Sequence, residues 1–351
     1  MTLDDTVRPR LKPNIYDVAA RAGVSHMTVS RVLNDHPNIT ESTRTRVVAA
    51  IGEMNYKRSS IARALATNRA MRVGVLVDRP IEYGPNCTLR ALEAAARLEG
   101  YAVSAFAVED DENLRISEGV DNLLTQGIDA LCVIAPRAAS LEALREILPP
   151  LPTVVIQASP DPSILTAAVD QHAGAALAVQ HLLELGHRRI LHIAGPPDWL
   201  DARARAEAWR QAISAAGLPE SPMIVGDWTS DFGYRVGAEH EAIDDVTAVF
   251  AGNDEMALGL IHGLWVRGLR VPDDISIVGF DDAPDTRHFL PPLTTVRQDF
   301  HELGTVAMRL LMEAIADPTA RAQAGLITPS LVIRSSTGPV SSARRAASGR
   351  P

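Results

Sequence analysis

The sequence is poor in the features that mark secreted, membrane-bound or metal-binding proteins. Its two cysteines, Cys87 and Cys132, form no CxxC pair, so neither a zinc site nor a disulfide framework is indicated. No apolar run reaches the roughly 18 residues that a membrane-spanning helix needs. The first residues contain two acids and no apolar core, unlike a secretory signal. These absences predict a soluble, cytoplasmic protein with no metal, no cofactor and no membrane partner.

Catalytic motifs are missing as well. The sequence contains no GxSxG nucleophile elbow and no phosphate-binding P-loop. The pairs His240–Glu241 and His301–Glu302 begin like the zinc motif HExxH, but Asp244 and Thr305 stand where the second histidine is required. We therefore expect a protein that is not an enzyme.

Charge is distributed unevenly along the chain. The 351 residues are 46% hydrophobic and 22% charged, which predicts two or three domains with a large core. Residues 1–70 hold 11 Lys and Arg against six Asp and Glu, a charge of +5. Because the whole chain carries −9, the remaining 281 residues sum to −14. A basic front end on an acidic body indicates that the front end meets a polyanion.

The front end has the pattern of three short helices. Residues 15–22 are apolar at positions i, i+3, i+4 and i+7, with Asn14 as N-cap and Gly23 as the turn that follows. Ser25 caps a second helix, and a third starts near Thr40. The inward residues are expected to be Ile15, Val18, Ala19, Ala22, Val29, Val32, Leu33, Val47, Val48, Ile51 and Met54. This pattern favours a DNA-binding helix-turn-helix, although a small helical bundle without a DNA role has the same periodicity.

The segment "RSSIARALATNRA" (58–70) joins this head to the rest of the chain. Ser59 or Ser60 can cap a short helix there, but about two turns of helix are marginal alone in water. The residues by themselves leave two interpretations open, a conditional hinge helix and a flexible linker.

From Met71 onward, apolar strand-like runs alternate with amphipathic helices. The runs are 72–77, 102–108, 130–135, 153–158, 188–195, 248–252 and 275–280. Such alternation predicts an α/β fold with parallel sheets covered on both faces, here as two Rossmann-like subdomains. Ligands bind such sheets beyond the carboxyl ends of the strands, so the cleft between the two lobes is the expected site.

Polar residues follow the predicted strands where such a ligand would bind. They are Asp78, Arg79, Gln157, Asn253, Asp254, Asp281 and Asp282, joined by Arg203, Arg205, Trp228 and Gln298. Paired donors and acceptors with an indole suit a sugar, whose hydroxyls need hydrogen bonds and whose C–H face packs on an aromatic ring. Each residue also has a structural interpretation: Trp228 as core, the Asn and Asp residues as caps, and the arginines as a solvated helix face.

Several blocks together resemble the LacI/GalR family of bacterial repressors. They are "YDVAARAGVSHMTVSRVLN", "TRTRVVAAIGEMNY", "HLLELGHRRILHIAG", "AVFAGNDEMALGL", "VPDDISIVGFDD" and "PPLTTVRQDFHELG". The resemblance covers roughly residues 13–335. It implies a helix-turn-helix head (13–57), a hinge helix and linker (58–70), and a two-lobed sugar-sensing and dimerisation body like the periplasmic binding proteins (71–335). The Ser, Gly, Pro and Arg content of the remaining residues predicts a disordered tail (336–351).

The resemblance assigns DNA contacts to the second helix. His26, Met27 and Arg31 would face base edges in the major groove, and Arg31 can pair bidentately with guanine. The residues implied to contact phosphates and set the register are Thr28, Ser30 and Asn34. In the hinge, Leu65 takes the position of a leucine that wedges into the minor groove. Arg58 departs from the proline common there.

The resemblance also assigns ligand contacts in the body. Arg205 would grip two hydroxyls, Asn253 would donate and accept, and Asp281 would accept two hydroxyl protons. Trp228 would stack on the ring and Gln298 would close the far side. The remaining candidates are Asp78, Gln157 and Phe300, with Phe280 as a further apolar wall. Gln157 replaces an aspartate found in a galactoside-binding member, so galactoside specificity does not follow.

The sequence therefore predicts a sugar-responsive repressor that binds a pseudo-palindromic operator as a homodimer and is released by a glycoside or disaccharide inducer. Two alternatives remain open at this point. One is a family member whose nucleobase-like corepressor tightens DNA binding, and the other is a sugar-binding protein without a DNA role. The tail "SSTGPVSSARRAASGRP" has no heptad of apolar residues, so we expect no tetramer.

Overall fold

The structure is a computed structural model that describes residues 13–56, 69–79, 81–108, 114–158, 164–219, 222–317 and 325–340. The chain divides into two compact units, Met1–Met71 and Arg72–Pro351, and each is treated by itself. Of the predicted hinge (58–70) only 69–70 fall within these ranges, so Leu65 lies outside the described residues. Within the described ranges, none of the helices combines the length and apolar character that a membrane crossing requires.

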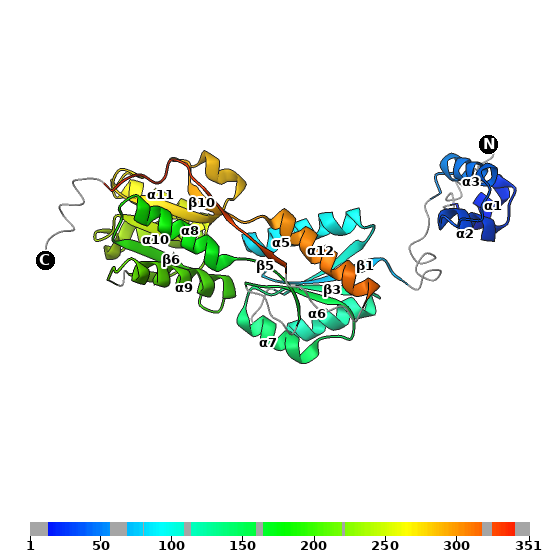
Figure 1. Cartoon of the computed structure of the whole chain (residues 1–351), viewed down its shortest axis with the longest axis horizontal. Coiled ribbons are helices and arrows are strands. Elements are labelled where there is room, and N and C mark those ends of the chain that lie inside the picture. The colour runs from blue at the N-terminus through cyan, green and yellow to red at the C-terminus, as the bar shows by residue number, and fades with distance from the viewer. Residues whose placement is uncertain are drawn as a thin grey trace, which may run out of the picture. The chain divides into compact units, whose positions relative to one another are not determined.

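The described part of the first unit contains three helices, α1 (Ile15–Ala22), α2 (His26–Leu33) and α3 (Glu41–Glu53) (Figure 1). The predicted caps are present. Asn14 and Asp17 form a reciprocal capping box, in which Asn14 Oδ1 accepts from Asp17 N at 3.2 Å and Asp17 Oδ2 accepts from Asn14 N at 2.8 Å. Gly23 ends α1 in the left-handed region with φ 65°, where glycine avoids a steric penalty. Ser25 Oγ accepts from Thr28 N and starts α2.

The core of the head is formed by the predicted apolar faces, with one error. Val18, Val29 and Val47 are fully buried, and they pack with smaller residues of all three helices. Val48 was expected inward but is 56% exposed, because its neighbour Val47 already occupies the inward direction and Ala50 takes the next buried position.

The second unit is built on two six-stranded sheets, one in each lobe. Lobe 1 has the order β11-β5-β4-β3-β1-β2, and lobe 2 has the order β12-β10-β9-β8-β6-β7. The strands of lobe 1 are β1 (Arg72–Asp78), β2 (Ala102–Val108), β3 (Ala130–Ile134), β4 (Thr153–Ile156), β5 (Leu165–Val169) and β11 (Gly325–Ile327). Those of lobe 2 are β6 (Ile190–Ala194), β7 (Met223–Val225), β8 (Ala248–Ala251), β9 (Ser276–Asp281), β10 (Thr294–Arg297) and β12 (Ser330–Val332).

Helices cover both sheets, as the apolar strands require. In lobe 1 they are α5 (Tyr83–Leu98), α6 (Leu114–Thr125), α7 (Ala138–Ile147) and α12 (Phe300–Ala316). In lobe 2 they are α8 (Gln171–Glu184), α9 (Leu200–Ala215), α10 (Ser230–Glu239) and α11 (Asp254–Val266), with short 3-10 turns η1 (Glu241–Ile243) and η2 (Pro284–His288). The two-lobed α/β prediction is therefore confirmed.

The lobes are not two successive halves of the sequence. The chain crosses between them three times, after β5, after β10 and after β11, so that α12 and β11 return to lobe 1 and β12 ends in lobe 2. The expectation of purely parallel sheets was also wrong at one edge, where β12 pairs antiparallel with β10. Three crossings place residues 170–171, 298–299 and 328–329 where the lobes join.

Helices α10 and α11 lie unusually close together because glycines face each other between them. A Cβ on Gly259 would fall 1.7 Å from Ser230 O, and one on Gly233 would fall 2.0 Å from Met256 O. This contact fixes one side of α11 against the lobe and leaves its opposite side outward.

The folded body extends beyond residue 335, where the tail was predicted to begin. Ser336 was assigned to a disordered tail, but it is fully buried, donates from Oγ to Ile277 O at 2.7 Å and accepts from Thr294 N. His187 Nε2 lies 3.0 Å from Gly338 O, and Val340 N donates to Leu185 O. The segment 336–340 is therefore part of lobe 2, because its polar groups satisfy buried partners there. The rest of the predicted tail, 341–351, lies outside the described residues.

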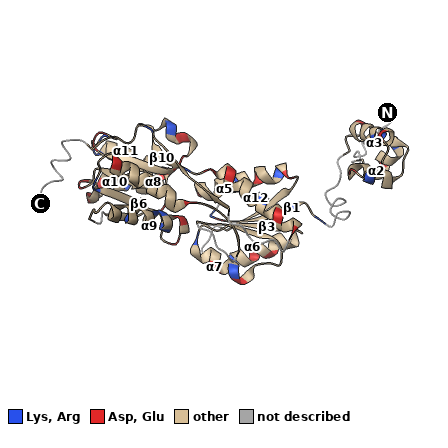
Figure 2. Ribbon diagram, in the orientation of Figure 1, with Lys and Arg blue, Asp and Glu red and all other residues tan. Residues whose placement is uncertain are grey.

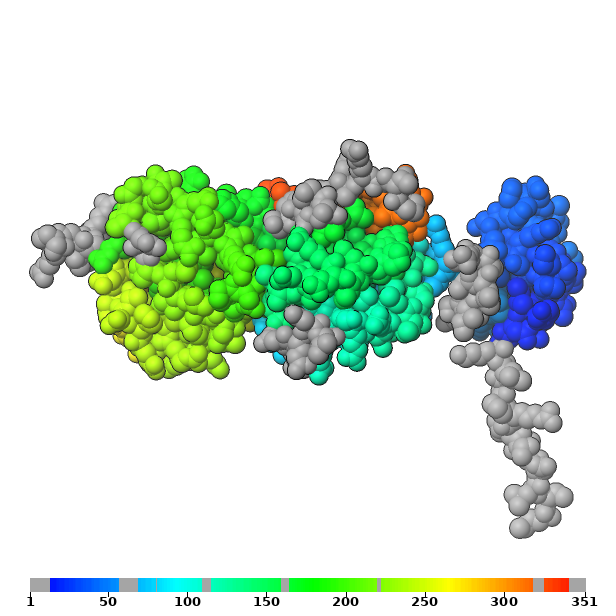
Figure 3. Space-filling view, turned by 90° about the horizontal axis from the view of Figure 1, so that it is seen from below, coloured from blue at the N-terminus to red at the C-terminus, as the bar shows by residue number. Residues whose placement is uncertain are grey.

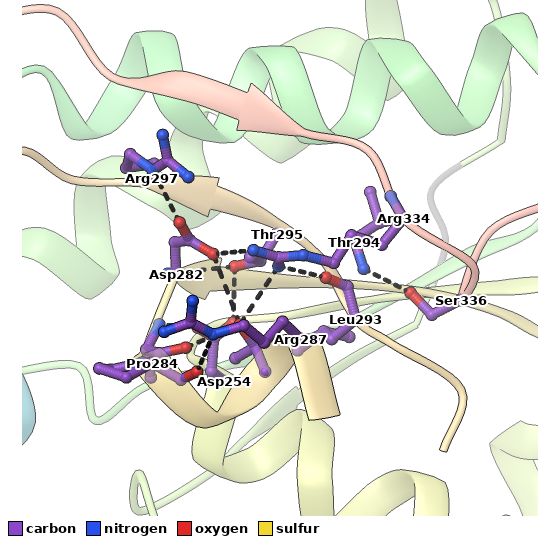
Figure 4. Close-up of polar contacts among 12 residues, drawn as sticks. Asp254, Asp282, Pro284, Arg287, Leu293, Thr294, Thr295, Arg297, Arg334 and Ser336 are labelled. Atoms are coloured by element: carbon purple, nitrogen blue, oxygen red, sulfur yellow. Dashed lines mark hydrogen bonds and ion pairs between the residues drawn. The ribbon is translucent and has the colours of Figure 1, made fainter. Parts of the chain in front are cut away.

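Asp282 is held by a clamp of two arginines next to β9 (Figure 4). Arg334 Nη2 donates to Asp282 Oδ1 at 2.6 Å, and Arg297 Nε donates to Oδ2 at 2.7 Å. Arg334 also donates to Leu293 O and Thr286 Oγ1. Burial alone would raise the pKa of Asp282, but the hydrogen bonds from Arg334 and Arg297 outweigh it and lower that pKa. Asp282 is thus a structural residue that ties the last strands of lobe 2 together.

Replacing Asp282 by Asn should destabilise the body by about 2 kcal/mol at neutral pH, because the partly buried Arg334 loses its charge-assisted hydrogen bond to a carboxylate. Asn tolerates the left-handed backbone at this position (φ 54°), so only the charge changes. The four tryptophans all lie beyond residue 198, so tryptophan fluorescence during urea unfolding reports on the body alone.

The stabilisation that Asp282 provides depends on pH, because its carboxylate must be ionised. Because its folded pKa is lowered, the stabilisation exists above the unfolded value near pH 4 and disappears as pH falls through the lower folded value. The matched control is Asp273→Asn, whose exposed partner Arg270 lies at 3.3 Å and which should cost less than about 1 kcal/mol. Equal losses for the two variants would refute the clamp.

Candidate functional site

A cavity of about 680 Å³, part of it open to solvent, lies between the two lobes of the body. Lobe 1 contributes residues from α5, the ends of β3 and β4, and the start of α12, while lobe 2 contributes residues from α9, β9 and the loops before α10 and α11. This is the position predicted from the carboxyl ends of parallel strands.

Seven of the eight predicted ligand residues line this cavity. They are Gln157, Arg205, Trp228, Asn253, Asp281, Gln298 and Phe300. They come from both lobes and from one crossing segment, and the polar ones are buried to at least nine-tenths. The structure therefore brings these side chains together, although their ligand contacts stay a prediction.

Asp78 does not line the cavity with the others. It is 2% exposed and forms a bidentate ion pair, accepting from Arg137 Nε at 2.8 Å and Arg137 Nη2 at 2.7 Å. Ser140 Oγ donates to the same carboxylate at 2.5 Å. The structure therefore does not place Asp78 on the cavity wall where it was predicted, because the strand end presents it to Arg137.

The ion pair of Asp78 and Arg137 lies next to a strand-like contact between the lobes. Ala138 N donates to Asp198 O at 3.0 Å, and Leu200 N donates to Pro136 O at 2.8 Å, so Arg137 and Trp199 form a short antiparallel bridge across the cleft. Figure 3 shows the two lobes in direct contact on the face seen from below. Asp78 thus supports the contact that brings the walls of the cavity together.

Four buried side chains form a hydrogen-bonded chain at the crossings. Arg205 Nε donates to Gln171 Oε1 at 2.9 Å, and Gln171 Nε2 donates to Gln298 Oε1 at 2.7 Å. Gln298 Nε2 then donates to Asp281 Oδ1 at 2.7 Å. Gln171 follows the first crossing and Gln298 lies in the second, so this chain joins two crossings to the wall of lobe 2. We name these four residues the crossing network.

Asp281 ends β9 with φ 120° and is 7% exposed. Burial raises its pKa to about 7, although Arg205 and the hydrogen bond from Gln298 act in the opposite direction. The carboxyl therefore keeps its proton to a higher pH than an exposed aspartate does. Hydroxyl donors from a ligand would favour the ionised form.

Asn253 and Trp228 support each other beside Asp281. Asn253 is the N-cap of α11, where its Oδ1 accepts from Met256 N at 2.9 Å, and its Nδ2 donates to Trp228 O at 3.0 Å. The cap interpretation is thus correct for Asn253, while Asp254 is buried and accepts from Thr295 Oγ1 and Ala283 N. One amide hydrogen and one lone pair of Asn253 stay free of these bonds.

Several lining residues were missed by the sequence analysis. They are Glu82, Tyr83, Thr88, Gln171, Trp199 and Asp201. Gln171, Asp201 and Tyr83 lie in the first turn of α8, α9 and α5. Helix starts after parallel strands face the same edge as strand ends, so a search of both would have included them.

The predicted DNA-facing residues share the outer side of α2. His26, Met27, Arg31 and Asn34 are exposed, with Met27 at 56%, whereas Thr28 and Ser30 are partly buried. Asn34 also ends the helix as its C-cap. An apolar side chain as exposed as Met27 on a helix with a buried opposite face is available to a partner.

The described head is not basic by itself, since residues 13–56 contain four Arg against four Asp and Glu (Figure 2). Arg21 pairs with Glu53 and Arg44 pairs with Asp35, both at 2.5 Å. The surplus of +5 therefore comes from the flanks, above all from residues 57–70, which hold four cations and no acid.

Comparisons with known proteins agree with this architecture. Residues 14–59 match the family described as bacterial regulatory proteins, lacI family, and residues 179–337 match the periplasmic binding protein-like domain. The lactose operon repressor of Escherichia coli K12 is 34% identical over 93% of this chain and 91% of its own length. The ribose operon repressor of the same strain is 34% identical over 91% and 98%. Sequence identity therefore does not separate the lac repressor from the ribose repressor as a relative of this chain.

Among solved structures, the lac repressor dimer bound to operator and the anti-inducer ONPF superposes with a TM-score of 0.82 at 30% identity. The match covers 93% of this chain and 100% of that chain. These relatives are DNA-binding repressors and not enzymes, as the absence of catalytic motifs had suggested. With a relative this similar along nearly its whole length, the chain belongs to the lacI family of bacterial regulatory proteins.

Proposed function

We propose that this repressor binds a pseudo-palindromic operator as a homodimer and is released from it by a small sugar in the cleft between its lobes. The observation that carries the proposal is the convergence of Arg205, Asn253 and Asp281 on one cavity with Trp228. Paired donors and acceptors beside an indole match vicinal hydroxyls and the C–H face of a sugar ring. We also retain the division into head (13–57), hinge (58–70) and body as part of this proposal.

The crossing network couples the sugar to the arrangement of the lobes. A hydroxyl that donates to Asp281 shares this carboxylate with Gln298, and one that accepts from Arg205 Nη2 shares the guanidinium with Gln171. Both glutamines belong to segments that pass between the lobes, so ligand contacts alter the hydrogen bonds of the crossings themselves. The ligand acts only through its different affinity for the two arrangements.

DNA binding is assigned to the exposed side of α2 and to the basic flank. Arg31 is exposed and has no acidic partner among the residues that the structure describes, so its guanidinium is available to a base edge. The cations of 57–70 would add phosphate contacts, and Leu65 would act as the minor-groove wedge. One head offers few contacts, which favours binding as a pair.

We propose the outward side of α11 as the contact between two copies. Leu258 is 42% exposed, Trp265 is 74% exposed and Val266 is 53% exposed, although the helix packs tightly on α10 through glycines. Such an apolar stripe on a helix otherwise fixed in a lobe is typical of a protein interface. The similar lac repressor structure is a dimer, which supports a second copy of this chain as the occupant.

Replacing Arg31 by Ala should weaken binding to the operator by roughly 1–3 kcal/mol and relax specificity at one base pair per half-site. The DNA upstream of its own gene supplies the test fragment, and fluorescence anisotropy measured over a salt series supplies the affinities. Arg309→Ala, an exposed arginine of α12 paired with Glu313, is the matched control and should change nothing. If wild-type protein binds scrambled DNA as tightly as the operator, the assignment fails.

Replacing Trp265 or Leu258 by Glu should convert the dimer into a monomer and lower operator affinity by more than about tenfold, because two heads no longer bind together. Light scattering at micromolar concentration measures the mass, and anisotropy measures the affinity. The control is Leu177→Glu on α8, where Leu177 is 39% exposed, and it should leave the dimer intact. A monomeric or tetrameric wild type would contradict the proposal.

Replacing Asp281 by Asn should reduce sugar affinity about tenfold to a hundredfold while operator binding persists, because one acceptor of charge-assisted bonds becomes a donor. Wild-type affinity should also rise about tenfold from about pH 6 to pH 8, as the carboxyl with a pKa of about 7 ionises, and the variant should lose this dependence. Calorimetry measures both. The neighbouring Asp282 cannot serve as the control, because its replacement would break the clamp with Arg334 and Arg297. The control is Asp244→Asn, whose side chain is 65% exposed.

The sign of the ligand effect separates induction from corepression. A sugar that weakens operator binding supports the proposal, whereas a nucleobase that binds the cleft and tightens operator binding would establish the corepressor alternative.

A further inference from the structure

The cavity wall carries more negative than positive charge. Among the described residues that line it, Glu82, Asp201 and Asp281 are acidic and Arg205 is the one basic side chain. Glu82 comes from lobe 1, at the start of α5, and the other three come from lobe 2. With all three carboxyls ionised, the wall would carry a net charge of −2.

Arg205 does not neutralise the carboxylates beside it by hydrogen bonding. Its Nε donates to Gln171 and its Nη1 donates to Gly252 O. Its Nη2 lies 3.9 Å from Asp281 Oδ1 and 4.0 Å from Asp201 Oδ2, beyond hydrogen-bond distance from either. Two acidic groups therefore share one guanidinium, whose other donors are held by neutral acceptors.

Burial without a hydrogen-bonded cation raises the pKa values of these acidic groups. Burial raises the pKa of Asp201, and Arg205 only partly opposes it. Burial also raises the pKa of Glu82, and the nearby Glu255 raises it further. A positive charge placed among these groups would stabilise their ionised forms.

Two indoles line the same cavity as Asp201. Trp199 precedes Asp201 by two residues, and its ring centroid lies 5.5 Å from that of Trp228 at an interplanar angle of 71°. Both tryptophans line the cavity and are at least nine-tenths buried. Indole faces attract cations, most strongly where water is excluded. The guanidinium carbon of Arg205 already lies 5.7 Å from the Trp228 ring centroid, so this wall holds one cation beside an indole. A carboxylate in the same wall makes it suited to an ammonium group as well.

We propose that the effector is an amino sugar whose ammonium pairs with Asp201 beside Trp199 and Trp228, while its hydroxyls bind Asp281 and Arg205. The inference rests on the proposed sugar-sensing function and names the class of sugar. Sugar phosphates and sugar acids are excluded by the same charge, because they would add an anion to an acidic, poorly solvated wall.

Calorimetry on the full chain at about pH 7 tests the charge directly. Glucosamine, galactosamine and mannosamine are each compared with the neutral parent sugar and with the N-acetyl derivative, which keeps the nitrogen without its charge. At least one amine should bind about tenfold or more tightly than both of its counterparts, a difference of about 1.4 kcal/mol. Glucose 6-phosphate should not bind.

The variant Asp201→Asn should reduce this amine-to-parent ratio to near one. Asp231→Asn is the matched control, because Asp231 occupies the same position in the first turn of α10, is exposed and does not line the cavity, so the ratio should persist. If Asp201→Asn fails to fold, Glu82→Gln tests the charge from the other lobe and should lower the ratio about threefold, through a loss of roughly 0.7 kcal/mol.

Each other outcome overturns the inference. Neutral parents that bind as tightly as the amines and release operator would refute the amino sugar but leave sugar sensing intact. A ratio that persists in Asp201→Asn would refute the assigned carboxylate. Failure of every sugar in all three series to bind would refute the inference, and failure of a wider panel of mono- and disaccharides to bind would refute the proposed function as well.

Discussion

The hydrogen bond between Gln171 and Gln298 is the contact on which the arrangement of the body depends most. It joins two of the three segments that pass between the lobes, and it does so at the wall of the cavity. Through Arg205 on one side and Asp281 on the other, the same bond is continuous with the groups assigned to ligand hydroxyls. A buried polar chain of this kind is favourable only when every member is satisfied, so a ligand cannot bind one end without affecting the other.

A second contact holds the lobes together away from the crossings. The bridge between Arg137 and Trp199 is supported by the buried carboxylate of Asp78, which pairs with Arg137 through two hydrogen bonds. The cavity is thus bounded by the crossing segments on one side and by a small backbone bridge on the other. Two lobes joined in this way can adopt a small number of distinct arrangements, which is what a two-state switch requires.

Much of this organisation could be predicted from the sequence, because it depends on local patterns. Caps at Asn14 and Ser25 and the turn at Gly23 are short-range features, and apolar runs identified strands of both lobes. The ends of those strands led to most of the cavity wall, since parallel strands end at one edge of a sheet. The family resemblance added roles that the residues alone left open.

What could not be predicted depends on long-range contacts. The three crossings rely on short strands such as β5 and β11, which pair across more than 150 residues. Asp78 was assigned to the ligand because no local signal shows that Arg137, 59 residues away, takes its carboxylate. Ser336 was assigned to the tail because its partners Ile277 and Thr294 are equally remote in sequence. In each case a polar residue forms hydrogen bonds with a partner that is distant in the sequence and comes close only in the folded chain.

The central claim is that the cleft and the DNA-binding head are linked through one equilibrium. The most direct test measures the affinity of the preferred sugar for the protein alone and for the protein saturated with operator. Linkage requires that operator weakens sugar binding by the same factor by which saturating sugar weakens operator binding, and we expect both factors to lie between about 5 and 150. Equal sugar affinity with and without operator would contradict the account, as would a sugar that binds more tightly to the DNA complex.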